Sequence, residues 1–304
     1  MSRETTVTEG TTEGIKGVEG FNADAHMAKV ENTSEKDMVY DFAKNQVERF
    51  LTALNESKLP CQPRENTKDG SYCDTYQARN VVWDNKYHGM NQLMLKIEQL
   101  EQGYKTGDYL TADAAKNAYD FYGKKYAVSM DGVSFLNKEA KPIVIMNNNK
   151  GMPNFVCLYN IDSFGDPQAI REFAAHLRDE KQQYIKEQKE AAGQKYYEPK
   201  SKSHDNGVVV CKSTDPAAFI GQWEAACSTG KGFKVTPEQN AAFIKSCNEY
   251  IRQPMENGQQ NSAYRLTKLM NESSRYCKDF IPTLFQKKGD PERTMASPEP
   301  EMGR

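Results

Sequence analysis

The apolar residues of this chain change their spacing twice along the sequence, and this change limits the fold more than any other feature. Apolar residues recur three and four positions apart in two stretches, Met38 to Leu54 and Met90 to Leu100, as in amphipathic helices. Strand-like runs occupy 126–161, and helical spacing returns after Asp166. We therefore predict an α+β fold in which N-terminal helices pack on a small antiparallel sheet, followed by a helical C-terminal part.

Capping and turn residues set the expected bounds of these elements. Ser34 opens a capping box for a first helix that Pro60 stops, and the second helix runs from about 89 to 102. The third begins after Thr111 and stops at Gly123. Strands are expected at 126–130, 133–136, 142–146 and 155–161, around turns at Asp131-Gly132 and 147–151. Later helices start at Asp166-Pro167, Asp215-Pro216, Thr236-Pro237 and about Ser262.

The 304 residues suffice for one large domain or two modest ones. Residues 1–33 are rich in Gly, Thr and Glu and are expected to form a disordered acidic leader, and 287–304 a disordered tail. Between them we expect a domain at 34–165 and a helical region at 166–286. The chain has no apolar leader and no membrane-length apolar run, and its seven cysteines include no Cys-x-x-Cys pair, so we expect a cytoplasmic protein with free thiols.

Signatures of catalysis and of metal binding are missing from the sequence. The four histidines form no His-Glu-x-x-His motif and no pair at helical spacing, and the glycine-rich phosphate loops are absent too. We therefore expect no catalytic residue, no metal and no cofactor. An enzyme acting on nucleic acid is the weakest of the functional hypotheses.

Positive charge is segregated along the chain although the net charge is only -2. The first forty residues are acidic, whereas Lys and Arg are mixed with aromatic residues between Arg64 and Lys150. A cation beside an aromatic ring suits single-stranded nucleic acid, because the cation meets phosphate and the ring stacks on a base. The start of the helix at Gly89 also offers free N–H groups to a phosphate. The structural alternative is that these tyrosines pack on the sheet and the lysines are ordinary surface residues.

Several segments together resemble the N-terminal domain of ArdC-like antirestriction proteins. They are Phe50 to Leu54 before Pro60, the Tyr-x-Gly-x-Asn helix start at Tyr87 to Leu95, Tyr109-Leu110-Thr111, Ala114 to Gly123, Lys141-Pro142-Ile143-Val144 and Val156 to Asp162. The resemblance covers about 40–165. It implies binding of single-stranded DNA, a plasmid or other mobile element, and protection of incoming DNA. We expect little sequence preference, and help with DNA transfer or replication is a further expectation.

This resemblance and the charge pattern together define the expected DNA-binding residues. They are Arg79, Lys86, Tyr87, Gly89, Asn91, Gln92, Tyr104, Lys105, Tyr109, Thr111, Lys124, Lys125, Tyr126 and Lys141. For Asn91, binding a phosphate and capping its own helix are equally good interpretations. The sequence departs from the family at Cys61, where a tryptophan is frequent, and it lacks the zinc motif of the longer members, so we expect no peptidase activity.

A protein-interaction factor, such as a host-directed inhibitor or adaptor, is the alternative function. It would use the same fold without binding DNA, and the near-neutral charge and acidic leader favour it. Self-association, or docking of a protein partner, through the C-terminal helices is a further expectation.

Overall fold

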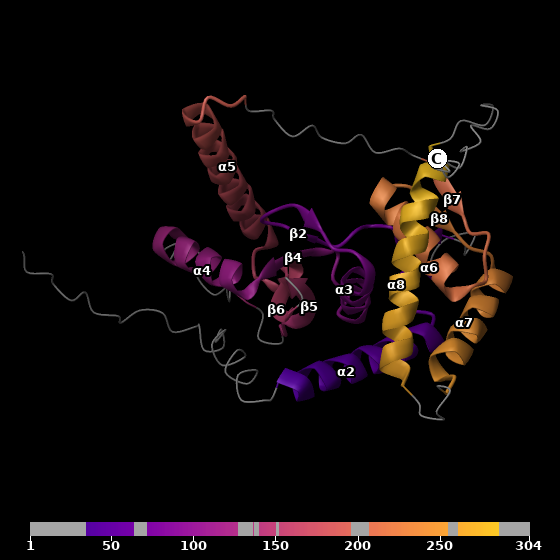
Figure 1. Cartoon of the computed structure of the whole chain (residues 1–304). Coiled ribbons are helices and arrows are strands. Elements are labelled where there is room, and N and C mark those ends of the chain that lie inside the picture. The colour runs from indigo at the N-terminus through magenta and orange to yellow at the C-terminus, as the bar shows by residue number, and fades with distance from the viewer. Residues whose placement is uncertain are drawn as a thin grey trace, which may run out of the picture.

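The computed structural model describes residues 35–63, 72–126, 136, 140–149, 152–195, 207–254 and 261–285 (Figure 1). Within these ranges the chain builds helices around two small sheets, one of five strands and one of three. The α+β class predicted from the sequence is confirmed. The predicted leader 1–33 and tail 287–304 lie outside the described residues.

The five-stranded sheet has the order β3-β2-β4-β6-β5. Its strands are β2 (Arg79–Asn80), β3 (Asn85–Lys86), β4 (Asp108–Thr111), β5 (Ile143–Asn149) and β6 (Met152–Asn160). β5 and β6 form the predicted hairpin, with Ile145 opposite Val156. The three asparagines expected in its turn, Asn147 to Asn149, instead belong to β5 and pair with β6, so the strands are longer than predicted. The sheet is mixed, because β2 and β4 run parallel whereas the other pairs are antiparallel.

Helices cover both faces of this sheet (Figure 1). Helix α3 (Gly89–Glu101) lies on one face, where Leu95 joins a cluster with Tyr109. Helices α4 (Ala112–Tyr126) and α5 (Pro167–Ala191) lie on the other, where Leu110 joins a second cluster. Tyr109 and Leu110 are neighbours in β4 and enter opposite clusters because side chains alternate along a strand. A short 3-10 turn, η1 (Ile161–Ser163), links β6 to α5.

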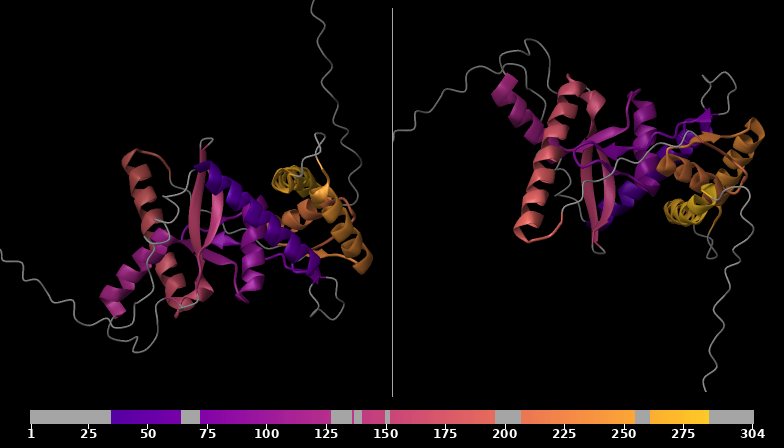
Figure 2. Two further views of the ribbon diagram at one scale, coloured as in Figure 1. Left: turned by 90° about the horizontal axis from the view of Figure 1, so that it is seen from below. Right: turned by 90° about the horizontal axis from the view of Figure 1, so that it is seen from above.

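The second sheet joins distant parts of the sequence. Strand β1 (Tyr72–Cys73) pairs with β8 (Gly232–Lys234), which pairs in parallel with β7 (Val208–Val210). The surrounding helices are α2 (Glu35–Asn55), α6 (Pro216–Thr229), α7 (Pro237–Arg252) and α8 (Ser262–Phe280), followed by η2 (Ile281–Leu284). Figure 2 shows α2 running below the sheet toward α7 and α8. The largest core therefore draws on both sides of the predicted division at residue 165.

The helix starts follow the predicted capping residues. Asp166 accepts hydrogen bonds from Gln168 N and Ala169 N, Asp215 caps α6, and Thr236 forms a capping box with Gln239. Thr111 Oγ1 accepts from Ala114 N at the start of α4. These predictions are confirmed, because a cap satisfies N–H groups within its own first turn and needs no distant partner.

Other predicted bounds are wrong. Helix α4 continues past Gly123, so Tyr126, expected to open a strand, is its last residue. Residues 127–135, with the Asp131-Gly132 turn, lie outside the described chain. Strands β1 to β4 and β7 and β8 are not apparent in the sequence, because runs of two to four residues are too short to display alternation.

Candidate nucleic-acid interface

An open hollow of about 710 Å³ lies between the β1–β2 segment and the C-terminal end of α3. Its lining is rich in tyrosine and comprises Tyr72, Cys73, Asp74, Thr75, Tyr76, Gln99, Leu100, Gly103, Tyr104, Lys105 and Thr106. Gly103 has a φ of +67°, the left-handed conformation that ends α3 and turns the chain toward Tyr104 and Lys105. The hollow is therefore built by a helix end and by a segment that enters the small sheet.

Two tyrosines of this hollow expose their rings. Tyr72 is 38% exposed and Tyr76 45%, and Lys234 Nζ lies 5.3 Å from the centroid of the Tyr72 ring. Lys105 is also exposed, beside the half-buried Tyr104. The hollow thus offers apolar ring faces and nearby positive charges to a ligand.

A buried ion pair holds one wall of the hollow in place. The Lys96 side chain, which is fully buried on α3, lies 2.7 Å from Asp74 Oδ2 and donates to Gln99 Oε1. Asp74 Oδ1 also accepts a hydrogen bond from Tyr76 N. Because a buried ammonium is tolerated only with good partners, these contacts anchor the 74–76 segment to α3.

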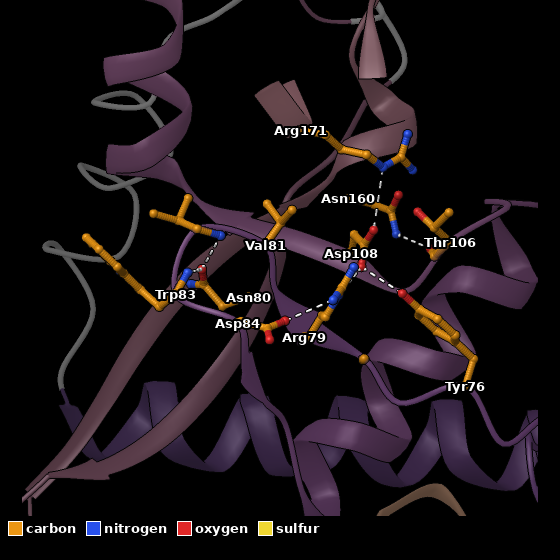
Figure 3. A network of polar contacts seen from close by, with 12 residues as sticks. Tyr76, Arg79, Asn80, Val81, Trp83, Asp84, Thr106, Asp108, Asn160 and Arg171 are labelled. Atoms are coloured by element: carbon orange, nitrogen blue, oxygen red, sulfur yellow. Dashed lines mark hydrogen bonds and ion pairs between the residues drawn. The ribbon is translucent and has the colours of Figure 1, made fainter. Parts of the chain in front are cut away.

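Beyond Tyr76, a network of charges continues across β2 and β4 (Figure 3). Arg79 donates from Nε to Asp108 Oδ1 at 2.8 Å and from Nη1 to Asp84 Oδ1 at 2.9 Å. The Tyr76 hydroxyl donates to the same Asp108 oxygen, and Arg171 Nε lies 3.7 Å from Asp108 Oδ2. The hydrogen bond to the buried Asp108 carboxylate raises the pKa of Arg79, so its guanidinium stays charged.

The turn between β2 and β3 presents Trp83 next to this network. Asn80 Oδ1 accepts hydrogen bonds from Val82 N and Trp83 N, which closes the turn. Val81 and Val82 are buried, whereas the Trp83 ring is 43% exposed. Lys181 Nζ of α5 lies 4.0 Å from the ring centroid, and Arg178 Nη1 donates to the Val81 carbonyl.

Three cations of α5 therefore lie along the same segment of chain. We call Arg171, Arg178 and Lys181 the α5 basic stripe. They follow one another at intervals of seven and three residues, so they share one face of the helix. Each contacts a different group: Asp108 of β4, or the Val81 carbonyl or the Trp83 ring in the turn between β2 and β3.

Of the residues expected from the sequence, only some lie on this surface. Arg79 is in the charge network, and Tyr104 and Lys105 line the hollow. Lys86 and Lys141 are exposed, on β3 and before β5. Tyr87 is half-buried against the core, and burial raises the pKa of its hydroxyl to about 12.

The start of α3 is tied to neighbouring elements by several hydrogen bonds. Gly89 N donates to the buried Glu224 carboxylate of α6 at 2.5 Å, so the expected anion position already holds a side chain. Asn91 Nδ2 donates to the Met146 carbonyl of β5. The buried Gln92 accepts from Ala78 N. The Asn91 amide thus ties α3 to β5, a role different from the helix cap considered for it, and phosphate binding by Asn91 stays a prediction.

Tyr109 and Thr111 also have structural roles. The Tyr109 side chain is fully buried and its hydroxyl donates to the Leu95 carbonyl at 2.6 Å, so its ring cannot meet a base. Thr111 caps α4. Lys124, Lys125 and Tyr126 form the end of α4, and their side chains lie outside the described part of the structure.

The residues that the sequence interpretation missed are Tyr72, Tyr76, Trp83 and the α5 basic stripe. The stripe was detectable in principle, because cations at positions i, i+7 and i+10 of a predicted helix share a face. The three aromatic residues sit in strands and turns of a few residues, for which the sequence offered no period.

Other classes of site find little support in the described residues. Their His, Cys, Asp and Glu side chains form no group of three or more that could hold a metal ion. All seven cysteines carry free thiols, and burial raises the pKa of Cys61, Cys227 and Cys247. None of the helices in the described ranges is both long and apolar enough to cross a membrane.

Comparison of the chain with known protein families, with curated proteins and with solved structures finds no match in any of the three.

Proposed function

We propose that this protein binds single-stranded DNA without catalysing a reaction on it. One observation carries the proposal: three exposed aromatic rings, Tyr72, Tyr76 and Trp83, lie beside a hollow and an arginine network, and surface lysines lie within cation–π distance of Tyr72 and Trp83. Aromatic rings stack on bases of any sequence, and cations follow the phosphate backbone.

The form of this surface favours a single strand over a duplex. A ring can stack on a base only when that base is free of its own neighbours, as in a single strand. A duplex presents phosphates and groove edges, which call for a protruding helix or strand ribbon rather than separated rings. We therefore expect affinity for unpaired bases with little sequence preference.

We also propose a biological setting for this DNA binding. The resemblance to ArdC-like N-terminal domains, which rests on sequence segments alone, implies protection or transfer of the DNA of a plasmid or other mobile element. The surface proposed here differs from the one that the resemblance implies, because the Tyr-x-Gly-x-Asn segment is half-buried and its Gly89 and Asn91 bond to α6 and β5.

Fluorescence anisotropy tests the proposal. The probe is a fluorescein-labelled oligothymidylate of about 20 nucleotides, compared with a duplex of equal length over a range of KCl concentrations. We expect Kd values of about 1 μM or lower for the single strand, rising with salt. Equal affinity for both probes, or no binding to either, would contradict the proposal.

A second candidate function, binding of a protein partner, is favoured by a different surface. Val208 and Val210 expose about half of their side chains on β7, the outer strand of the three-stranded sheet. An extended segment of a partner polypeptide can add to such an edge through backbone hydrogen bonds. Pull-down after complete nuclease digestion tests this function, and Val210→Lys should then abolish capture while leaving oligothymidylate binding unchanged.

A further inference from the structure

Two arginines from distant parts of the chain meet at one buried carboxylate. Arg79 comes from β2 and Arg171 from the first turns of α5, and Asp108 of β4 contacts both. Asp108 is only 3% exposed, whereas the two arginine side chains are 37% and 36% exposed. A buried anion thus orients two cations whose outer parts reach solvent.

The contacts leave donor groups on the outer side of this pair. Arg171 faces Asp108 with Nε, and Figure 3 shows one of its terminal nitrogens pointing away from that carboxylate and the other beside Nε. Among the described residues, no acceptor is within hydrogen-bond distance of these two nitrogens. Arg79 turns Nη1 to Asp84, whose side chain is 59% exposed.

The charges of the group select an anion of a particular kind. Asp108 neutralises one of the two guanidinium charges, which leaves one positive charge for a partner at the surface. In the free protein Asp84 supplies that partner, but an exposed ion pair of this kind stabilises the fold little. A phosphodiester carries one negative charge and two acceptor oxygens, which suit the planar fork of an arginine.

We propose that Arg79 and Arg171, oriented by Asp108, bind one phosphodiester of a single strand and that this phosphate replaces Asp84 on Arg79. Trp83 follows within the same turn, so a base next to that phosphate meets its ring. This pair of arginines thus fixes the position of the DNA strand on the protein. The inference rests on the proposed function.

The proposal makes opposite predictions for two neighbouring residues. Arg171→Gln removes donors and should weaken oligothymidylate binding by about tenfold. Asp84→Asn removes the competing charge and should strengthen binding several-fold. Asp84 has a φ of +55°, a conformation that asparagine adopts readily, so this substitution keeps the turn.

The experiment measures Kd for the labelled oligothymidylate of about 20 nucleotides against KCl concentration for the full chain and its variants. Arg171→Gln should reduce the slope of log K against log salt by about 0.7, the value for one phosphate of a single strand. Arg252→Gln, at the exposed end of α7, is the matched control and should leave affinity and slope unchanged. An oligonucleotide with uncharged methylphosphonate linkages should bind the wild type and Arg171→Gln equally.

Each result separates this inference from the proposed function. Trp83-dependent binding of the wild type with an unchanged slope in Arg171→Gln would overturn the phosphate site and leave DNA binding standing. Weaker binding by Asp84→Asn would overturn the exchange of Asp84 for phosphate. No binding by the wild type would overturn both proposals.

Discussion

Trp83 is exposed at the end of a turn whose preceding residues are buried. Val81 and Val82 enter the core beside α4 and α5, and Asn80 Oδ1 accepts hydrogen bonds from Val82 N and Trp83 N. The turn therefore leaves the indole ring on the outside, with Lys181 over one face. A large apolar ring kept at the surface by the turn that carries it is well placed to stack on a base.

Trp83→Ala should weaken binding of the labelled oligothymidylate by about 1–3 kcal/mol, or about fivefold to more than a hundredfold in Kd. The loss follows from the removal of one stacking surface. Tyr264→Ala is the control, since Tyr264 is similarly exposed on α8, away from this surface. Equal effects of the two variants would show that Trp83 has no special role in binding.

Glu224 is a buried acid that joins two helices. It lies on α6, and its Oε1 accepts the hydrogen bond of Gly89 N at the start of α3. Burial raises the pKa of its carboxyl, although the Gly89 hydrogen bond acts in the opposite direction. The folded protein therefore binds a proton at this site more tightly than the unfolded chain does.

This shift predicts a pH dependence of stability. A raised folded-state pKa stabilises the fold below the unfolded pKa of Glu224, and this contribution is lost as pH rises through the folded pKa. Glu224→Gln should therefore gain stability relative to wild type as pH rises from about 4 to 8, in urea unfolding at each pH.

Glu238→Gln is the control with the opposite sign. The pKa of the exposed Glu238 at the start of α7 is lowered by a backbone hydrogen bond, so its contribution is lost as pH falls. A stability difference between Glu224→Gln and wild type that does not change with pH would show that the carboxyl has no raised pKa.

Helices α6 and α8 approach closely at a glycine. A Cβ placed on Gly221 would lie 2.7 Å from the Ser273 carbonyl oxygen and 3.0 Å from the Tyr276 ring. The first of these neighbours is backbone and cannot move without displacing α8. The small residue therefore sets the distance between two helices that enclose the largest core.

Gly221→Ala should destabilise the protein by about 1–3 kcal/mol, because the clash exceeds the gain in helix propensity. Gly232→Ala is the matched control, since its Cβ would meet Val208 only at an ordinary 3.5 Å. Urea unfolding measures both variants. An unchanged midpoint for Gly221→Ala would contradict the close approach of the two helices.

The molecule as a whole is joined through α3 and β1. Residues Gln92 to Gln99 of α3 are all buried, because one side of the helix packs on the sheet and the other on the C-terminal helices. β1 pairs with β8, and Trp223 Nε1 donates to the Asp74 carbonyl. The two predicted regions, 34–165 and 166–286, therefore share one hydrophobic core, and more than a small contact surface joins them.

This shared core predicts that a cut chain stays together. A protease site inserted into segment 196–206 should yield two pieces that elute as one particle in size-exclusion chromatography and unfold in one transition. The reason is that separation would expose the apolar residues of α2, α3 and α8 together. Elution of two separate species under native conditions would contradict the shared core.

The sequence predicted those elements whose stability is local. The caps at Asp166, Asp215 and Thr236 and the β5–β6 hairpin depend on contacts within a few residues. For α3 it predicted the helix and one apolar face, Met90, Leu93, Ile97 and Leu100, but not that Lys96 and Gln99 are buried too. Burial on both sides depends on what packs around a helix, which its own spacing does not encode.

By itself, then, the sequence determined the α+β class, most helix starts and the gathering of cations and aromatic residues between Arg64 and Lys150. Only the tertiary structure decided which of them share a surface. Arg178 reaches the Val81 carbonyl across 97 residues, and Arg171 reaches Asp108 from another element. Tyr109 belongs to the same stretch of cations and aromatic residues as Tyr76. Its side chain is instead buried, and its hydroxyl donates to the Leu95 carbonyl. The physical reason is that capping and periodicity act within one or two turns of chain, whereas a binding surface is set by which distant segments the core brings together.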